Sequence, residues 1–443
     1  MAKTWQANAP FAALFPMPNH PFSATPTTSQ SACHHDDAAH DTRRELDASM
    51  EAPHVDWMQS QMTSRPTWAE IDVAALRFNL ANIRARIDGN DIGQSERPVQ
   101  IMGVVKANAY GHGLIRTACE MVKAGVEQLG VAFVEEGIAL RRAGIAVPIL
   151  VLGGIVGPQL RDFLEHDLMI TASSVWKLDL IEEAAQALNK RAKIHVKIDT
   201  GMERLGIHHY NAAQLFEAVT ATRHCDLCGV FSHLASSQSS DGSFTQLQLE
   251  RFLDAISWFE KQGLPTPLRH IANSGGVLQH PATWLDMVRP GLLAYGVYPG
   301  DDVEKTIDVK PVLSLKTRVV YFKVVPEGAR VGYDGTWTAA RDSRVVTLPV
   351  GYGDGYRRSL SNKGEVLIRG ARYRIAGVVS MDQITVDIGQ GTAYNNDEVV
   401  LIGSQNDEKI SIEQVARWMD TIPYEVLTGI NTRVPRVYVE RVA

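Results

Sequence analysis

Residues 104–113 read VVKANAYGHG, an apolar run that ends at Lys106 and is followed by two glycines before a helical pattern. Apolar runs that lead through a short turn into a helix are typical of parallel α/β folds. Burial penalises a lysine ammonium and lowers its pKa, so a lysine at a strand end can form a Schiff base with a carbonyl and transfer protons. The alternative is a solvated lysine in a loop.

Outward from this segment, eight apolar runs of strand length alternate with amphipathic stretches of helix length. The runs cover residues 101–105, 129–134, 148–152, 168–172, 193–198, 227–234, 268–272 and 287–295. This alternation predicts an α/β fold, a (β/α)₈ TIM-like barrel over residues 66–306, with both faces of its parallel strands buried.

The pattern changes after about residue 311, where short alternating strands with turn residues predict a mostly-β C-terminal domain over residues 307–443. Its expected strands are 314–325, 344–349, 365–369, 373–379, 384–388, 398–402 and 436–439, with one late helix at 411–420. A strand at 68–72 and a helix at 73–87 lead into the barrel. Residues 1–65, rich in small and polar residues, are expected to form a flexible extension.

The composition of the chain limits the classes of protein to which it can belong. With 443 residues, 45% of them apolar, the chain can bury the cores of two or three domains. The net charge of −6 comes from interspersed charges, and without a basic tract we expect no nucleic-acid partner. No apolar run reaches the ~18 residues of a membrane span.

Four cysteines, Cys33, Cys119, Cys225 and Cys228, are too few for a disulfide framework and indicate a reducing compartment, the cytoplasm. Cys225 and Cys228 form a C-x-x-C pair, which we interpret as packing in a strand. The alternative is a metal site, but the pair lacks partner cysteines, and we expect no metal.

Active sites of such barrels lie at the C-terminal ends of the strands, and polar residues gather there in this sequence. Lys106 follows the first strand, residues 199–206 follow the fifth, His233 ends the sixth, and Arg289 interrupts the eighth. Residues 273–276 follow the seventh strand. We therefore expect these side chains to converge.

A phosphate cradle is predicted after the seventh and eighth strands, where these barrels often hold a phosphate. Asn273 and Ser274, with two following glycines, offer N–H groups and a hydroxyl; Gly291 and Leu292 add N–H donors, and Tyr110 a phenol. The alternative is an ordinary Asx turn.

Together these motifs closely resemble those of bacterial alanine racemases, which use pyridoxal 5'-phosphate, and the resemblance extends from about Trp68 to the C-terminus. It implies that Lys106 holds the cofactor, that Arg289 holds its pyridine nitrogen, and that His233 lies in the network behind. An arginine cannot be deprotonated, so it would leave the nitrogen neutral and limit the electron sink. A barrel-rim ion pair is the alternative for Arg289.

Racemisation needs acid–base groups on both faces of a planar intermediate. Tyr333, in the segment VGYDGTW at residues 331–337, resembles the family's catalytic tyrosine, which comes from the partner subunit of a head-to-tail homodimer. A tyrosine hydroxyl, with an ordinary pKa of about 10, needs neighbouring cations to act as a base at neutral pH. Tyr333 would remove the Cα proton of the L-isomer and Lys106 would return one. The alternative is a packed turn aromatic.

Substrate contacts also follow from the resemblance. Arg204 matches the arginine near the substrate carboxylate, and Lys197 a lysine that is often carbamylated and orients it. Met381 and Asp382 match residues that approach the carboxylate from the other subunit. Tyr352 matches the entrance tyrosine, although its glycine-rich surroundings are equally typical of a plain turn.

Two positions depart from the family pattern. Ser380 replaces a common cysteine, and Thr432 stands where some members place a phosphate-binding tyrosine, which leaves that contact open. The implied function is interconversion of L-alanine and D-alanine, supplying D-alanine for peptidoglycan. A broad-spectrum amino-acid racemase and a non-catalytic pyridoxal-phosphate carrier are the alternatives.

Overall fold

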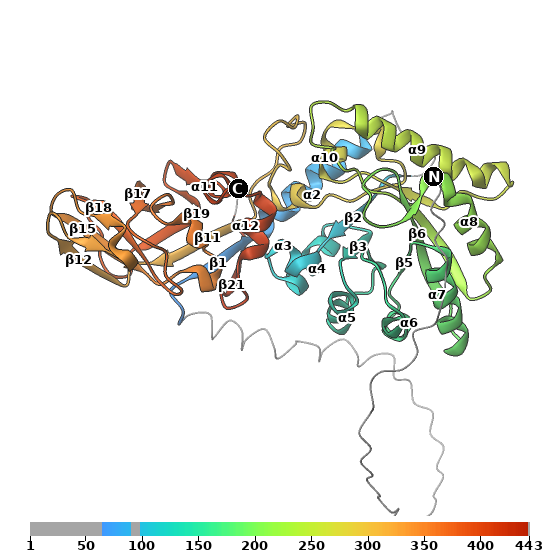
Figure 1. The fold of residues 1–443 in the computed structure, drawn as a ribbon, viewed down its shortest axis with the longest axis horizontal. Coiled ribbons are helices and arrows are strands. Elements are labelled where there is room, and N and C mark those ends of the chain that lie inside the picture. The colour runs from blue at the N-terminus through green and yellow to red at the C-terminus, as the bar shows by residue number, and fades with distance from the viewer. Residues whose placement is uncertain (1–63, 90–97, 442–443) are drawn as a thin grey trace, which may run out of the picture. The chain divides into compact units, whose positions relative to one another are not determined.

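The computed structural model describes residues 64–89 and 98–441 and confirms the predicted (β/α)₈ barrel followed by a mostly-β domain (Figure 1). The barrel strands are β2 (Gln100–Val104), β3 (Gln128–Val131), β4 (Ile149–Val151), β5 (Ile170–Ala172), β6 (Ala192–Asp199), β8 (Cys225–Phe231), β9 (Leu268–His270) and β10 (Met287–Val288). They pair in parallel in the orders β10-β2-β3-β4 and β5-β6-β8-β9. A bridge between Leu150 and Met169 and the packing of β9 on β10 close the ring.

Helices surround the strands as the sequence predicts. They are α2 (Val73–Asp88), α4 (Leu114–Lys123), α5 (Val134–Arg142), α6 (Leu160–Glu165), α7 (Val175–Ala187), α8 (Ala212–Ala221), α9 (Ser243–Lys261) and α10 (Ser274–Gln279). Asp72 begins α2 by accepting hydrogen bonds from the N–H groups of Ala74 and Ala75. Since α2 packs against α4 and against the turn after β10, it takes the place of a helix following the last strand.

The eighth strand is shorter than predicted. Strand β10 ends at Val288, and residues Leu292–Tyr295 form the 3₁₀ helix η4 instead of continuing the predicted run 287–295. Pro290 lies between them and lacks the N–H that a central strand would donate.

The β domain is built on a ten-stranded sheet. Its path is β12-β15-β18-β17-β16-β19-β11-β1-β21, with β20 paired to β19. The strands are β1 (Trp68–Asp72), β11 (Leu313–Arg318), β12 (Tyr321–Val325), β15 (Ser343–Leu348), β16 (Glu365–Ile368), β17 (Ala371–Ile375), β18 (Ile384–Gly389), β19 (Glu398–Gln405), β20 (Glu408–Ile410) and β21 (Arg436–Val439). Around it lie the β13 (Arg330–Val331) and β14 (Trp337–Thr338) hairpin and the helices α11 (Ile412–Met419) and α12 (Pro423–Gly429).

Strand β1 corrects the predicted organisation, which placed residues 68–72 with the barrel. It lies between β11 and β21, antiparallel to the first and parallel to the second; Figure 1 shows its blue arrow among the orange and red strands. Ala69 and Ile71 are fully buried, and this alternation suits a strand with one face in the core. The chain therefore starts the β domain before it builds the barrel.

Buried apolar residues form one large cluster that continues from the barrel into the β domain. A smaller cluster fills the barrel axis with Met102, Leu150, Met169, Phe231 and Met287. Among the described residues, no helix is both long and apolar enough to cross a membrane. Cys33 and the predicted extension up to residue 63 lie outside the described residues, whereas Cys225 and Cys228 lie in β8, where burial raises the thiol pKa of Cys225 to about 12.

Candidate active site

Lys106 lies directly after β2, at the C-terminal end of the barrel strands, and is half-buried. Burial lowers the pKa of its amine, and the positive charges of Arg204 and Arg289 lower it further, while Glu136 opposes them. A depressed pKa makes a lysine available as a neutral amine. This is the behaviour that the sequence predicts at this position.

The turn after Lys106 was not predicted. Residues 107–110 all adopt left-handed backbone, with φ between 52° and 56°, before α4 begins. Left-handed conformation costs a residue with a side chain about 1–2 kcal/mol, so other contacts must hold it. Glu136 does so by accepting from Ala107 N–H at 2.7 Å, and Asn108 Oδ1 accepts from Leu114 N–H at 2.8 Å.

Glu136 contacts the turn after Lys106, although the sequence analysis does not single it out. Its other carboxylate oxygen accepts from the N–H groups of Ala132 and Phe133, at the end of β3. The carboxylate of Glu136 therefore connects the residues after β3 with the turn that follows Lys106. An acidic residue in the first turn of a helix was the available signal, but it does not reveal the contact with Ala107.

The residues predicted to form a phosphate cradle lie together. Ser274 Oγ, buried, accepts from the N–H groups of Gly291 at 3.0 Å and Leu293 at 3.3 Å. A Cβ atom added to Gly291 would lie 2.6 Å from Tyr110 Oη, so the glycine is what allows the phenol to approach. Leu292, whose N–H is predicted to donate to the phosphate, is buried between Gly291 and Leu293 in sequence.

Asn273 holds the loop in shape. Its Oδ1 accepts from Gly276 N–H at 3.2 Å and from the hydroxyl of Ser237 at 2.6 Å, and its Nδ2 donates to Leu234 O. Asn273 therefore forms the Asx-type cap that was the alternative reading. That role positions Ser274 and is compatible with a cradle.

Arg289 is buried and bound on several sides. Its Nη2 donates to Ser232 O at 2.8 Å and to Ile271 O at 3.1 Å, and lies 3.4 Å from His233 Nδ1. Burial lowers its pKa to about 9, which keeps it protonated at neutral pH. Among the described residues it pairs with no carboxylate, which contradicts the barrel-rim alternative.

His270 is the partner of Arg289 that the sequence reading missed. Arg289 Nη1 lies 2.8 Å from its Nδ1, and the ring is fully buried. The available signal was a histidine at the end of the short strand β9. A polar residue at that point of a barrel strand faces the site or the barrel interior.

Lys197 and Arg204 lie on and after β6. Lys197 Nζ is 4.5 Å from the centroid of the Phe231 ring, and burial lowers its pKa far below the ordinary value, with Arg289 adding to the effect. Asp199 shapes the loop that carries Arg204, because its carboxylate accepts from the four backbone N–H groups of residues 201–204. Burial raises the pKa of Asp199, but these donors outweigh it and leave the pKa below its ordinary value.

The predicted residues of the β domain form a second group. Tyr333 is 67% exposed in the turn η5 (Tyr333–Gly335), and Met381 and Tyr352 are 53% and 42% exposed. Arg433 joins part of the group, since its Nη2 donates to Asp382 Oδ1 at 2.7 Å and to Met381 O at 3.3 Å. No hydrogen bond or ion pair between described residues links this group to the barrel group.

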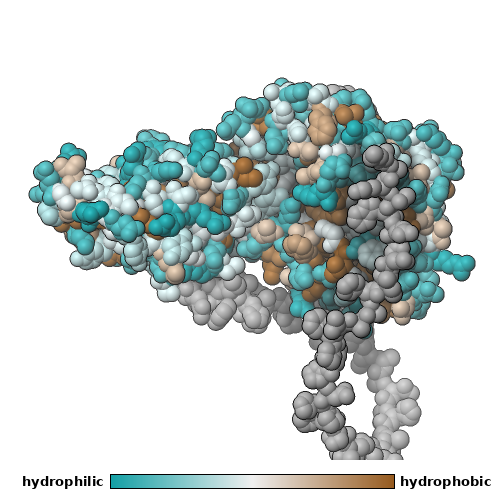
Figure 2. All heavy atoms as spheres, in the orientation of Figure 1, coloured by the Kyte–Doolittle hydropathy of each residue, from teal (hydrophilic) through white to brown (hydrophobic). Residues whose placement is uncertain are grey.

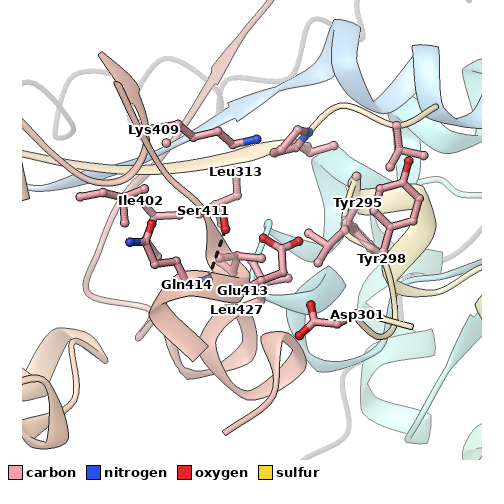
Figure 3. Close-up of a pocket in the computed structure, with 18 of the residues that line it drawn as sticks. Tyr295, Tyr298, Asp301, Leu313, Ile402, Lys409, Ser411, Glu413, Gln414 and Leu427 are labelled. Carbon is pink, nitrogen blue, oxygen red and sulfur yellow. Dashed lines mark hydrogen bonds between the residues drawn. The ribbon is translucent and has the colours of Figure 1, made fainter. Parts of the chain in front are cut away.

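A cavity of about 450 Å³ lies elsewhere, between the start of α11 and the turn η4. Figure 3 shows Ser411, Glu413 and Gln414 on one side of it and Tyr295 and Tyr298 on the other. None of the predicted site residues lines this cavity. The candidate site is therefore the strand-end cluster around Lys106.

Comparison with known proteins identifies the relatives of the chain. The family models for the alanine racemase N-terminal and C-terminal domains match residues 71–299 and 312–438. The chain belongs to the alanine racemase family. A curated alanine racemase of Halothermothrix orenii is 41% identical over 387 residues, which cover 86% of this chain and 98% of the relative.

Solved structures of the family share the fold. An alanine racemase of Clostridium difficile 630 aligns with a TM-score of 0.79 at 35% identity, covering 85% of this chain and 96% of its own. An alanine racemase from D-cycloserine-producing Streptomyces lavendulae aligns equally well, with a TM-score of 0.79 at 35% identity over 85% and 98% of the two chains.

Proposed function

We propose that this chain is a pyridoxal-phosphate-dependent racemase that interconverts L-alanine and D-alanine, and that its D-alanine serves peptidoglycan synthesis in the cytoplasm. The observation that carries the proposal is the half-buried Lys106 amine, whose pKa is depressed beside the guanidinium groups of Arg204 and Arg289. Family membership supports the same reaction.

The strand-end cluster fits the cofactor. Tyr110, Ser274 and Gly291 form a cradle of hydroxyl and N–H groups that a single added Cβ would fill. Arg289 is anchored by two carbonyl groups and is suited to donate to a ring nitrogen. Bound there, pyridoxal phosphate supplies an electron sink that makes the Cα proton of an amino acid acidic.

The residues of this chain then have distinct tasks. Lys106 Nζ accepts or donates a proton on one face of Cα, and Tyr333 Oη does so on the other. Arg204 binds the substrate carboxylate, for which its planar fork is suited. A guanidinium that donates without giving up its proton limits the sink and so favours return of the proton over side reactions.

The two groups of residues meet in a head-to-tail homodimer in this proposal, so that Tyr333, Tyr352, Met381 and Asp382 serve the barrel of a second copy. The exposure of Tyr333 and Met381 supports it, because large apolar surfaces are usually covered. The barrel offers exposed apolar groups at its C-terminal end, among them Phe133, which is 63% exposed after β3. Figure 2 shows apolar residues on the surface of the barrel, whereas the visible surface of the β domain is mostly hydrophilic.

Lys197 carries a carbamate in this proposal. Burial lowers the pKa of its amine well below the ordinary value, which favours the neutral form. The neutral amine adds carbon dioxide and releases one proton to water, which leaves the carbamate anion. The carbamate anion would lie among the positive charges of Arg204 and Arg289, which favour it. Protein equilibrated with ¹³C-bicarbonate should show a carbamate carbon signal that is lost in Lys197→Ala; its persistence in that variant would assign the signal to another lysine.

The proposed reaction is tested by deuterium exchange. Purified protein with pyridoxal phosphate in D₂O should place deuterium at Cα of both L-alanine and D-alanine, with loss of optical rotation. Exchange without inversion would contradict a racemase, and binding of the cofactor without exchange would favour a non-catalytic carrier. The same assay with lysine, arginine and methionine tests a broad-spectrum activity.

A further inference from the structure

A chain of buried polar side chains leads from Arg289 through the barrel interior. Arg289 Nη1 lies 2.8 Å from His270 Nδ1, and His270 Nε2 lies 2.9 Å from His195 Nδ1. Arg289, His270 and His195 are 4%, 0% and 1% exposed. The three side chains come from β6, β9 and the end of β10, so the chain crosses the barrel core.

The direction of these hydrogen bonds is determined by Arg289. A guanidinium only donates, so His270 Nδ1 must accept, and the neutral ring then carries its proton on Nε2. The His270 Nε2–H group donates to His195 Nδ1. Since His195 Nδ1 accepts, the neutral His195 ring also carries its proton on Nε2. Burial, followed by the charge of Arg289, lowers the pKa of His195 to about 3 and the pKa of His270 well below its ordinary value, so both rings are neutral at neutral pH.

Packing locks both rings. Phe231 stacks on His270 with the ring planes 1° apart and the centroids 4.8 Å apart. A Cβ atom added to Gly229 would lie 2.6 Å from the His195 ring, so a glycine is needed opposite it. The pairing of β6 with β8 shifts register at this point, which makes room for the ring.

His195, the last member of this series of hydrogen-bonded side chains, lines a cavity at the opposite end of the barrel from Arg289. This cavity of about 270 Å³ is also lined by Gln128, Asp167, Lys193 and Cys228. Gln128 begins β3 and Lys193 lies near the start of β6, so the cavity lies at the N-terminal ends of the strands.

From this arrangement we infer that His195 is a positioning residue, which acts on Arg289 through His270. By accepting from His270 Nε2–H, His195 holds His270 in the tautomer whose Nδ1 receives the guanidinium. Without that acceptor, His270 can take the other tautomer, and its Nδ1–H would then oppose the Arg289 N–H. The inference rests on the proposed function, because Arg289 acts on the reaction only if it faces the cofactor ring.

The tautomer can be read without the reaction. In ¹⁵N NMR spectra of histidine-labelled wild-type protein at pH 7, His270 should be neutral, with Nδ1 unprotonated and Nε2 protonated. An imidazolium or an Nδ1–H tautomer would overturn the inference. This result is independent of whether the protein racemises alanine.

Variants of the holoenzyme test the consequence. His195→Leu removes the acceptor and should lower kcat for alanine at least about tenfold, with little change in KM and a shifted cofactor absorption band. His195→Asn keeps an acceptor near the Nδ1 position and should recover kcat to within about threefold of the wild type. Cys228→Ala, which alters the same cavity but not the chain, should match the wild type.

Two outcomes contradict the role. A folded His195→Leu enzyme with wild-type kcat would show that Arg289 needs no support from this chain. Equal impairment of His195→Asn and His195→Leu would show that only ring packing matters. If wild-type protein fails to racemise alanine, the proposed function fails, while the NMR result still decides the tautomer.

Discussion

At the scale of single residues, the site depends on close approaches that one extra carbon would abolish. Gly291 allows Tyr110 Oη to reach the Ser274 loop, and Gly229 allows the ring of His195 to lie in the barrel core. Both positions need the absence of a side chain, and neither has a positive φ. Single buried histidines matter as well. Burial lowers the pKa of His112 and His195, so both rings remain neutral in the folded protein at neutral pH.

Replacement of Gly291 by alanine should weaken cofactor binding. The added Cβ would lie 2.6 Å from Tyr110 Oη and displace the phenol from the cradle. We expect the dissociation constant of pyridoxal phosphate to rise about tenfold or more, measured by fluorescence titration of apoprotein. Gly157→Ala, where no atom lies within 4 Å of the added Cβ, is the matched control. Unchanged affinity in Gly291→Ala would remove Tyr110 from the cradle.

Acid should destabilise the protein partly through His112. Burial lowers its pKa in the folded state to about 4, against about 6.5 when unfolded, so the unfolded chain binds more protons as the pH falls below 6.5. Stability from this group is therefore lost from about pH 6.5 down to about pH 4. In His112→Asn, which keeps a donor for the carbonyls of Ala109 and Tyr110, the drop in unfolding free energy from pH 7 to 5 should shrink by ~2 kcal/mol.

Denaturant titrations at equal protein concentration measure this difference. His166→Asn, which replaces a half-buried histidine near the barrel surface, should follow the wild type. If His112→Asn loses as much stability in acid as the wild type, the burial of a neutral His112 is not a source of acid sensitivity.

At the scale of elements, loops after the strands carry the side chains, and acceptors within the loops set their shape. The loop after β6 is organised by Asp199, which accepts four backbone N–H groups up to Arg204. Glu136 performs the same task for the turn after β2. Both carboxylates hold the backbone of a loop that carries a predicted site residue, and the charge of Glu136 also opposes the lowering of the Lys106 pKa.

Asp199→Asn should therefore misplace Arg204. An amide keeps one acceptor oxygen but turns an NH₂ group toward the N–H of Arg204, which now donates to Oδ2 at 3.1 Å. We expect KM for alanine to rise several-fold, roughly 1 kcal/mol, with a smaller change in kcat. Asp226→Asn, at a surface ion pair with Arg191, is the control. Equal KM values in both variants would show that the loop does not depend on Asp199.

The eight barrel strands were predictable because hydrophobic periodicity survives in buried parallel strands. In the β domain, α12 was missed, and the expected strand 314–325 is divided into β11 and β12. Lys106 and Asn273 were predictable because each follows one of the barrel runs, whereas His270, which ends β9, was missed. The left-handed turn at residues 107–110 was not predictable, since alanine favours right-handed helix. Nor was the place of β1, because sheet partners far apart in sequence, such as Glu70 and Val437, leave no local pattern.

At the scale of the whole molecule, the proposed dimer requires one chain to carry two half-sites. The barrel carries Lys106 and the proposed cofactor cradle, and the β domain presents Tyr333 on an exposed turn. Sequence periodicity cannot reveal which copy completes which site. A head-to-tail pair with two identical shared sites is the arrangement that two-fold symmetry allows.

Complementation between inactive variants tests this arrangement most directly. Lys106→Ala and Tyr333→Phe homodimers should each be inactive, because every site lacks one of its two acid–base groups. In dimers formed from both variants, one site combines the intact Lys106 of one copy with the intact Tyr333 of the other, so an equal mixture refolded together should recover about a quarter of wild-type racemase activity. A mixed sample no more active than the separate variants would contradict an active site shared between two copies.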